Sequence, residues 1–354
     1  MSYRSIKQRD TRSMLSSLRF PSFAVAAWAL AVAAHAEKPV EAVAPAACHG
    51  TDMIAELESK DPEIFKSIIA DSRKLENTEA LLWKIEKPGA DPSYLFGTVH
   101  LSDSRVTGMS DKVKNTLHQS KQLAVEVADL SDAAMAKAMT NAAGLLIYTD
   151  GHTLSEKLSP EEFKQVQGVL EKSGLPGDVA PMLRPWIINM LLAISDCERK
   201  RVAAGVTVLD MKLEEEAKKD KINIVGLETI EQQLASLAEV ADDEQIQMLK
   251  AGLKYADRTD DMIETMVQLY LKRQMGAAVP FQIAMAAKAG TPASAYDSFQ
   301  KSLLVDRNAR MRDKVKPLID MGAAFVAIGA LHLPGKTGLV ALLREAGYTI
   351  TPVE

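Results

Sequence analysis

The chain of 354 residues is poor in cysteine and in aromatic residues: it has two cysteines, and aromatic residues make up 5% of it. Neither Cys48 nor Cys197 stands in a Cys-x-x-Cys or similar spacing, so cysteine ligands for a metal are not expected. In an oxidising compartment the two thiols can pair as a disulfide; the alternative is a pair of buried, unreactive thiols. The sequence leaves both states open.

The chain also lacks a strong net charge and a long apolar run. A net charge of -5 and a pI near 5.8 give no reason to expect nucleic acid or an anionic membrane surface as a partner. The strongest late apolar segment, residues 185–197, is shorter than the ~20 residues that a membrane helix needs, and it predicts a buried helix. We therefore expect no transmembrane segment in the mature chain.

The N-terminus has the order of a secretory signal. Residues 1–22 are basic, residues 23–34 are apolar, and Ala34-His35-Ala36 is an A-x-A cleavage site. This pattern predicts a signal peptide over 1–36, so that the mature protein is expected to be periplasmic or secreted. An uncleaved anchor or a mitochondrial presequence is the alternative. Residues 37–75 are expected to form a leader and an N-terminal helix.

Apolar patterning predicts an α/β fold, with a small mixed sheet core built from the N- and C-terminal regions and a large helical insertion at about 130–320. The domain is expected to span 76–354. Strands are predicted at residues 81–85, 94–96, 123–127, 222–225, 324–328 and 348–350. Helices are predicted at residues 110–120, 131–146, 161–173, 208–219, 230–239, 246–276, 280–289 and 303–321.

Two hexapeptides repeat one pattern: apolar, Gly, small, apolar, His, Leu. They are residues 96–101, with Gly97 and His100, and residues 328–333, with Gly329 and His332. From the composition, about 0.3 Gly-x-x-His matches are expected by chance. Each match also closes a predicted strand, where loops bind ligands in α/β sheets. A glycine at such a strand end lets the backbone turn sharply or come close to a ligand. A histidine beside it can bind a metal ion or act as a general base near neutral pH.

Glu126 adds an acid to this pattern, because it stands in the apolar run 123–127, where a charge is costly unless it is paired or binds a metal. Two histidines and a carboxylate match a catalytic metal site with room for water. The alternative for Glu126 is a strand residue that faces solvent or an arginine. No role is assigned to the other histidines of the mature part, which are His49, His118 and His152.

Three further acids are expected to stabilise helix starts, since carboxylates there accept backbone N–H groups or oppose the helix dipole. Asp103 and Asp210 are interpreted as capping residues. Glu228 stands before Thr229, the expected cap, although it also suits a role as a second acid.

The chain resembles the TraB/PrgY/GumN family, which is related to the TIKI metalloproteases, from about residue 81 to 353. The resemblance rests on LLWKIEKPGADPSYLFGTVHLSD, AVEV, VGLETIEQQLASL, DRNARM and VAIGALHLPGKTGLVALLREAGY. It implies that His100 and His332 are the motif histidines, that Glu126 is the family's acid, and that Arg307 and Asn308 are its polar pair. A guanidinium at Arg307 suits a substrate carboxylate or an oxyanion; the alternative is a surface charge.

These features predict an exported hydrolase, peptidase-like and dependent on a divalent metal (Mn, Co or Zn). His100, His332 and Glu126 would be the metal ligands, and Glu126, Arg307 and Asn308 the catalytic groups. The expected partner is a peptide or a glycan-related substrate in the envelope. A metal-free His/Glu hydrolase and a non-catalytic envelope factor, linked to polysaccharide or peptide export, are the alternatives.

Overall fold

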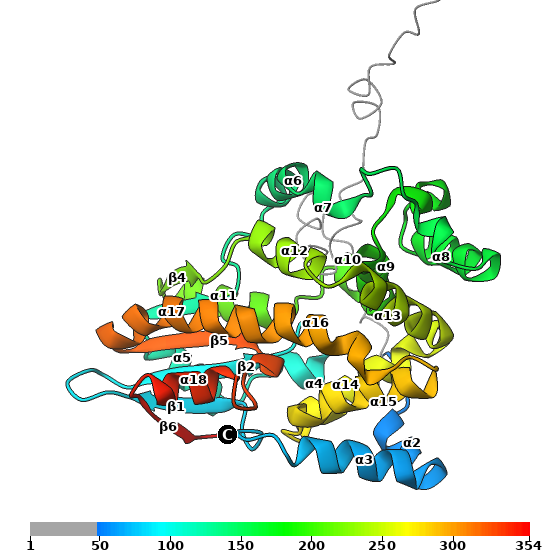
Figure 1. Cartoon of the computed structure of the whole chain (residues 1–354). Coiled ribbons are helices and arrows are strands. Elements are labelled where there is room, and N and C mark those ends of the chain that lie inside the picture. The colour runs from blue at the N-terminus through cyan, green and yellow to red at the C-terminus, as the bar shows by residue number, and fades with distance from the viewer. Residues whose placement is uncertain (1–47) are drawn as a thin grey trace, which may run out of the picture.

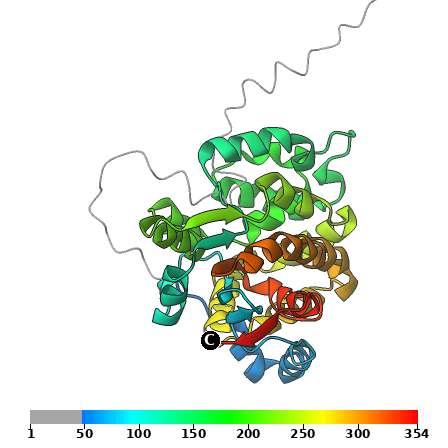
Figure 2. The same cartoon turned by 90° about the vertical axis from the view of Figure 1, so that its left-hand side faces the viewer.

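A computed structural model describes residues 48–354, so the predicted signal peptide and residues 37–47 of the leader lie outside the described part. The structure confirms the α/β class and its mixed sheet. The six strands are β1 (Leu82–Glu86), β2 (Ser93–Thr98), β3 (Gln122–Val125), β4 (Asn223–Gly226), β5 (Ala324–Gly329) and β6 (Thr349–Pro352). Their order in the sheet is β4-β3-β5-β2-β1-β6, with β6 and β4 at the two edges (Figure 2).

Four neighbouring strands of this sheet run parallel. β5 pairs in parallel with β2 on one side and with β3 on the other, and β3 pairs in parallel with β4. β1 is antiparallel to both β2 and β6, which places the hairpin and the last strand at one edge. Because parallel strands end at the same edge of a sheet, the residues after β2, β3, β4 and β5 emerge together.

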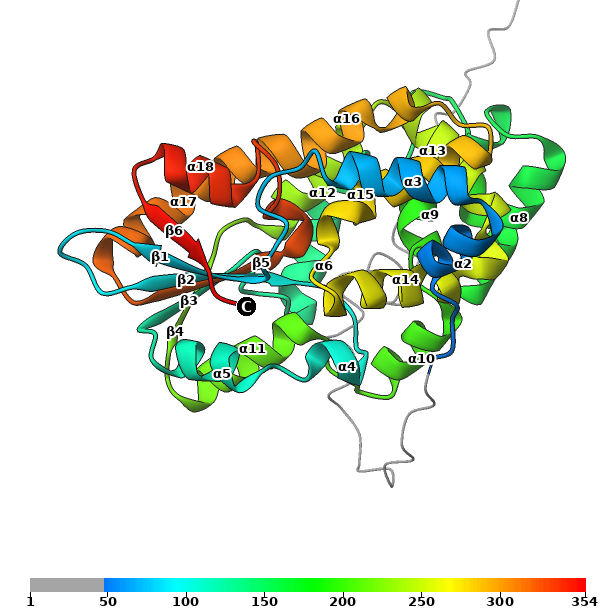
Figure 3. The ribbon, with the colours of Figure 1, turned by 90° about the horizontal axis from the view of Figure 1, so that it is seen from below.

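Alternation along the strands builds a core on each face of the sheet. In β5, Phe325 and Ala327 belong to one buried cluster, while Val326 and Ile328 belong to another. The first cluster includes side chains of α5 (Asp111–His118) and α11 (Leu209–Lys219), and the second those of α17 (Asp306–Met321) and α18 (Leu339–Glu345). The sheet therefore lies between two helical layers, which Figure 3 shows from below.

Further helices form the part of the molecule that lies above the sheet and to its right in Figure 1. They are α2 (Met53–Lys60), α3 (Pro62–Ser72), α4 (Ser104–Thr107), α6 (Asp132–Asn141), α7 (Ala143–Leu146), α8 (Pro160–Lys172), α9 (Pro185–Leu192), α10 (Asp196–Ala203), α12 (Ile230–Ala238), α13 (Asp242–Lys254), α14 (Thr259–Leu271), α15 (Ala278–Lys288) and α16 (Asp297–Gln300). No helix within residues 48–354 combines the length and the apolar character needed to span a bilayer.

The prediction of one continuous helix over 246–276 is wrong, because two helices occupy this range. α13 ends at Lys254, a 3-10 turn covers Ala256–Arg258, and α14 begins at Thr259. Tyr255 reaches the carbonyl of Met285 on α15, and the break turns Arg258 toward Glu56 on α2. Apolar periodicity continues through the break because both helices bury a face, so the pattern gave no sign of it.

The beginning of the described chain is fixed to the helical half. Cys48 and Cys197 form a disulfide, with 5.7 Å between their Cα atoms. The backbone N–H of Thr51 donates to Asp261, and that of Met53 donates to Thr265, both on α14. The N-terminal segment is thus tied to α10 and α14.

Candidate functional site

Three predicted site residues meet at the carboxyl edge of the parallel strands. His100 follows β2, Glu126 comes directly after β3, and His332 lies in the 3-10 turn after β5 (Ala330–His332). A Cβ atom built on Gly329 would lie 3.2 Å from Glu126 Oε1, 3.5 Å from His332 Cδ2 and 4.0 Å from His100 Nε2. The structure therefore brings both histidines and the acid around one point above β5.

Each motif glycine allows a close approach that a larger residue would prevent. At Gly97 a Cβ atom would lie 2.6 Å from Leu333 Cδ1 and 3.1 Å from Ala330 Cα, so the two histidine loops pack directly on one another. At Gly329 the backbone N–H donates to Glu126 Oε1 over 2.7 Å. Gly97 is thus a packing requirement of two loops that touch, whereas a side chain at Gly329 would crowd the Glu126 carboxylate.

Both histidine rings are oriented through Nδ1. The Nδ1 atom of His100 lies 2.8 Å from Asp210 Oδ2, and Asp210 Oδ1 accepts a hydrogen bond from the Thr98 hydroxyl over 2.7 Å. The Nδ1 atom of His332 lies 2.7 Å from Asn308 Oδ1. An acceptor at Nδ1 fixes the ring and directs Nε2 toward the site, as is usual for histidines that bind metals.

The Asp210 capping prediction is wrong. Val208 is the N-cap of α11, and the Asp210 carboxylate turns to Thr98 and His100 instead. An aspartate in the first turn of a helix can stabilise the helix dipole or can orient a distant histidine, and the local sequence is the same in both cases. The sequence around Asp210 therefore gave no sign of its contact with His100. The predictions for Asp103 and Thr229 agree with the structure, because each is an N-cap whose side chain accepts a backbone N–H.

Glu126 is only 4% exposed and holds a dense set of hydrogen bonds. Besides the Gly329 N–H on Oε1, its Oε2 accepts from Arg307 Nη2 over 2.6 Å and from Gln233 Nε2 over 3.1 Å. Gln233 was not predicted, although it stands in the GLETIEQQ segment. These donors hold the carboxylate in place and stabilise its charge.

Arg307 is a buried ion-pair residue rather than a surface charge, since it is 6% exposed. Its Nε and Nη2 donate to Glu228 Oε2 over 2.9 and 2.7 Å, in addition to the bond with Glu126. Glu228 is buried as well and also accepts from Arg310. Glu228 is therefore part of the charged network behind Glu126, and Arg307 contacts both acids.

Burial and neighbouring charges set the protonation of the cluster. Burial alone would raise the pKa of Glu126, but Arg307 and the two histidines lower it to about 2. Burial, with the charge of Arg307, lowers the pKa of His332 to about 3. Burial opposes the charged form of His100 too, yet the Asp210 carboxylate raises its pKa to about 9. At neutral pH the acid is ionised, His332 is neutral and His100 carries a second proton, which a metal ion would have to displace in order to bind Nε2.

The donor chemistry fits a divalent cation. His332 Nε2 lies 4.0 Å from Glu126 Oε1, whereas two ligands of a tetrahedral Zn²⁺ ion, each about 2 Å from it, lie about 3.3 Å apart, so the two groups would have to move closer together to share an ion. Across residues 48–354, no three His, Cys, Asp or Glu side chains lie close enough together to coordinate a metal ion as they stand. The site presents two oriented imidazoles and an ionised carboxylate, which suit Mn, Co or Zn in donor type.

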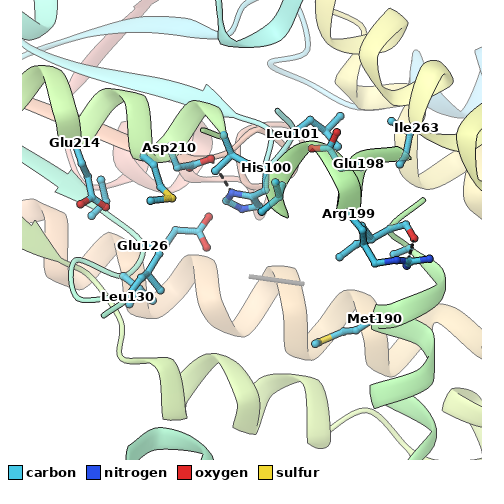
Figure 4. A pocket seen from close by; sticks show the side chains of 17 residues that line it. His100, Leu101, Glu126, Leu130, Met190, Glu198, Arg199, Asp210, Glu214 and Ile263 are labelled. Carbon is cyan, nitrogen blue, oxygen red and sulfur yellow. Dashed lines mark hydrogen bonds and ion pairs between the residues drawn. The ribbon is translucent and has the colours of Figure 1, made fainter. Parts of the chain in front are cut away.

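Two cavities of about 240 Å³ each open at the cluster, and both are lined by His100, Glu126, Leu130 and Met190. The acid-lined cavity also contains Asp210, Glu198 and Glu214 (Figure 4). In that view, the His100 ring and the Glu126 carboxylate extend toward one another. The other cavity, which we call the apolar cavity, contains His332 and Arg307 and is otherwise lined mainly by apolar side chains.

This fold and site define a class: an α/β protein with paired Gly-x-x-His loops and a buried glutamate at the carboxyl edge of parallel strands. The family model described as TraB/PrgY/gumN matches residues 81–352. The chain belongs to the TraB/PrgY/gumN family. The matched region includes every strand of the sheet and all of the cluster residues.

Several curated proteins are similar to this chain at low identity. The uncharacterized protein YbaP of Shigella flexneri is 25% identical over 260 residues, which is 73% of this chain and 90% of YbaP. Metalloprotease TIKI1 of Xenopus tropicalis is 24% identical over 324 residues, or 79% of this chain. Metalloprotease TIKI1 of Homo sapiens is 25% identical over 318 residues. The chain spans about 62% of the Xenopus protein and 61% of the human one.

Proposed function

We propose that this chain is an exported, metal-dependent hydrolase of the peptidase type, with His100, His332 and Glu126 as its site. The observation that carries the proposal is the convergence of two histidines, 232 positions apart in sequence, and an ionised glutamate around Gly329. The similarity to proteins named metalloproteases supports the reaction class.

Each neighbouring residue has a defined task in this proposal. Asp210 and Asn308 hold the Nδ1 atoms of the two histidines, so that both Nε2 atoms are presented to the ligand. Arg307 keeps Glu126 ionised and in position. A bound divalent ion would supply polarisation of the scissile carbonyl and of a water molecule. In this proposal Glu126 and the two histidines would hold the ion, and the Gly329 N–H and Arg307 keep the carboxylate oriented toward it.

Export is supported by two independent features. Residues 1–36 have the order of a signal peptide, and the described chain contains a disulfide between Cys48 and Cys197. Disulfides persist in oxidising compartments such as the periplasm or the extracellular space. We therefore place the site in the envelope or outside the cell, where a peptide segment is the expected substrate.

The first test measures metal content and hydrolysis of a peptide pool for purified wild type, His100→Ala and His332→Ala. We expect about one divalent ion per wild-type chain, and loss of both bound metal and activity in each variant, because each ligand is needed. His118→Ala is the matched control, since His118 pairs with Asp220 on the surface, away from the cluster.

Three results would redirect the proposal. Unchanged metal content in both ligand variants would refute the metal site. Hydrolysis that survives exhaustive chelation would select a metal-free reaction, in which Glu126 and a histidine act as base and acid. Full rescue of a deletion phenotype by the double variant His100→Ala/His332→Ala would instead select a non-catalytic envelope factor.

A further inference from the structure

The apolar cavity shares its polar end with the proposed site. His100, Glu126, Arg307 and His332 all contribute to its lining. The rest of the lining comes from helices that are distant in sequence, such as Met135 of α6, Leu234 of α12, Met266 of α14, Phe299 of α16 and Leu304 of the π-helical segment Lys301–Val305. A group bound in this cavity would therefore touch the cluster.

The lining is apolar but not sealed. Met135, Met266, Phe299 and Leu304 are all half-buried. The exposed large hydrophobic side chains among residues 48–354 are Met182, Val305 and Met321, and none of them lines the cavity. The half-buried lining side chains therefore leave partly open apolar surface beside the cluster, which a bound apolar group would cover.

The π-helical segment contributes to this arrangement. Leu303 and Leu304 are consecutive residues, yet both line the cavity, and Arg307 follows within one turn. Single π-helical turns inside helices are rare and are often found at functional sites. Here the segment joins the apolar wall of the cavity directly to the buried arginine of the cluster.

We propose that the apolar cavity is the specificity pocket of the enzyme, and that it binds a bulky apolar side chain (Leu, Met or Phe) of an extended peptide next to the scissile bond. This assignment rests on the proposed hydrolase function. Side chains of this kind gain free energy when they leave water for an apolar lining, and the half-buried methionines adapt to different shapes.

The same features argue against a glycan. Sugar hydroxyls require hydrogen-bond partners when they are buried, but the polar groups here are engaged with each other: Gln233 and Arg307 donate to Glu126, and Asn308 contacts His332. The cavity, at about 240 Å³, is also below the ~300–1,000 Å³ of clefts that hold drug-sized ligands. It suits one large side chain.

The test uses two fluorescein-labelled dodecapeptides, one with Leu-Phe at its centre and the other with Ser-Ser at those positions. Binding is followed by fluorescence anisotropy, and cleavage by mass spectrometry, for wild type, Leu304→Glu and Val305→Glu. Val305 is the matched control, because it neighbours Leu304 but is 37% exposed and does not line the cavity. We expect wild type to prefer Leu-Phe at least tenfold, Leu304→Glu to lose the preference, and Val305→Glu to retain it.

A second variant covers the case in which Leu304→Glu does not fold, as judged by circular dichroism. Leu304→Trp fills the cavity with apolar atoms and should shift the preference from Leu-Phe toward a peptide with Ala-Ala at its centre. Equal binding of the two peptides by wild type, absence of binding by both, or equal effects of Leu304→Glu and Val305→Glu would overturn the pocket. A Leu-Phe preference without any cleavage would leave the pocket in place and reject the hydrolase.

Discussion

Asp210 shows how much of this site depends on single residues outside the motif. Its two carboxylate oxygens contact Thr98 and His100, which lie more than 100 positions earlier in the chain. Asn308 plays the same part at His332, because its Oδ1 contacts the Nδ1 atom of that ring. The Nδ2 group of Asn308 donates a hydrogen bond to the carbonyl of Thr337, which fixes the amide. Both residues touch an imidazole and act through it, so they position the site.

Replacement Asp210→Asn should weaken the site without unfolding the protein. The amide is close in shape to the carboxylate, but it no longer stabilises the His100 ring by its charge, and losses of about 10–100-fold in metal affinity or activity are typical of such changes. Isothermal titration with Mn²⁺ or Zn²⁺ measures this, together with the ring-nitrogen NMR signals of His100. Glu215→Gln, an exposed acid on the same helix, is the control. Wild-type affinity in Asp210→Asn would contradict this role.

Among the elements, α10 supports the loop that carries His100. Glu198 accepts the Ser102 N–H and hydroxyl over 2.6 and 2.9 Å, and Arg201 donates to the Ser102 carbonyl over 2.8 Å. The Cys48–Cys197 disulfide holds the same helix to the beginning of the described chain. One short helix thus connects the histidine loop to the covalent cross-link.

The double variant Cys48→Ser/Cys197→Ser should lower the free energy of unfolding by about 2–4 kcal/mol. The reason is that the two cysteines are 149 positions apart, so the disulfide closes a long loop in the unfolded chain and reduces its conformational entropy. Urea unfolding of wild type with and without reductant, next to the variant, measures the effect. The reduced wild type should match the variant. An unfolding midpoint that is the same in all three samples would show that the cross-link does not stabilise the fold.

In the whole molecule, Arg105 links the region after β2 to the helical half. Its guanidinium donates to the carboxylate of Asp103, next to the His100 loop. It also donates to both carboxylate oxygens of Glu264 on α14, over 2.9 and 2.6 Å. Hydrogen bonds from Arg105 lower the pKa of both acids below their ordinary values of 3.8 and 4.5. The resulting stability is present above those values and is lost as the pH falls through the lowered ones.

Arg105→Ala should therefore cost about 1 kcal/mol of unfolding free energy at pH 7, a small value because the arginine is 41% exposed and partly screened. The difference from wild type should shrink as the pH falls below about 4. Thermal unfolding across the pH range measures it. Lys66→Ala, which removes an exposed pair with Glu63, should change nothing. A pH-independent difference for Arg105→Ala would assign its effect to packing instead.

Local pattern alone was enough for the strands and most helices of this molecule. Strand β5 is a short apolar run, a turn rich in Pro, Gly and Asp separates β1 from β2, and Thr229 and Asp103 are caps that act within three positions of themselves. The paired Gly-x-x-His loops were also visible, since each repeats one pattern at the end of an apolar run. These features depend on neighbours in the sequence, and so the sequence by itself determined them.

The tertiary structure decided which of these groups meet. The parallel order of β3, β5 and β2 brings His100, Glu126 and His332 to one edge, and no local pattern encodes that order. The same holds for Asp210 at His100, for Glu228 behind Arg307 and for the break at Tyr255. Each of these depends on contacts between segments that are far apart in the chain, where the free energy of burial and of charge pairing, rather than local propensity, sets the partner.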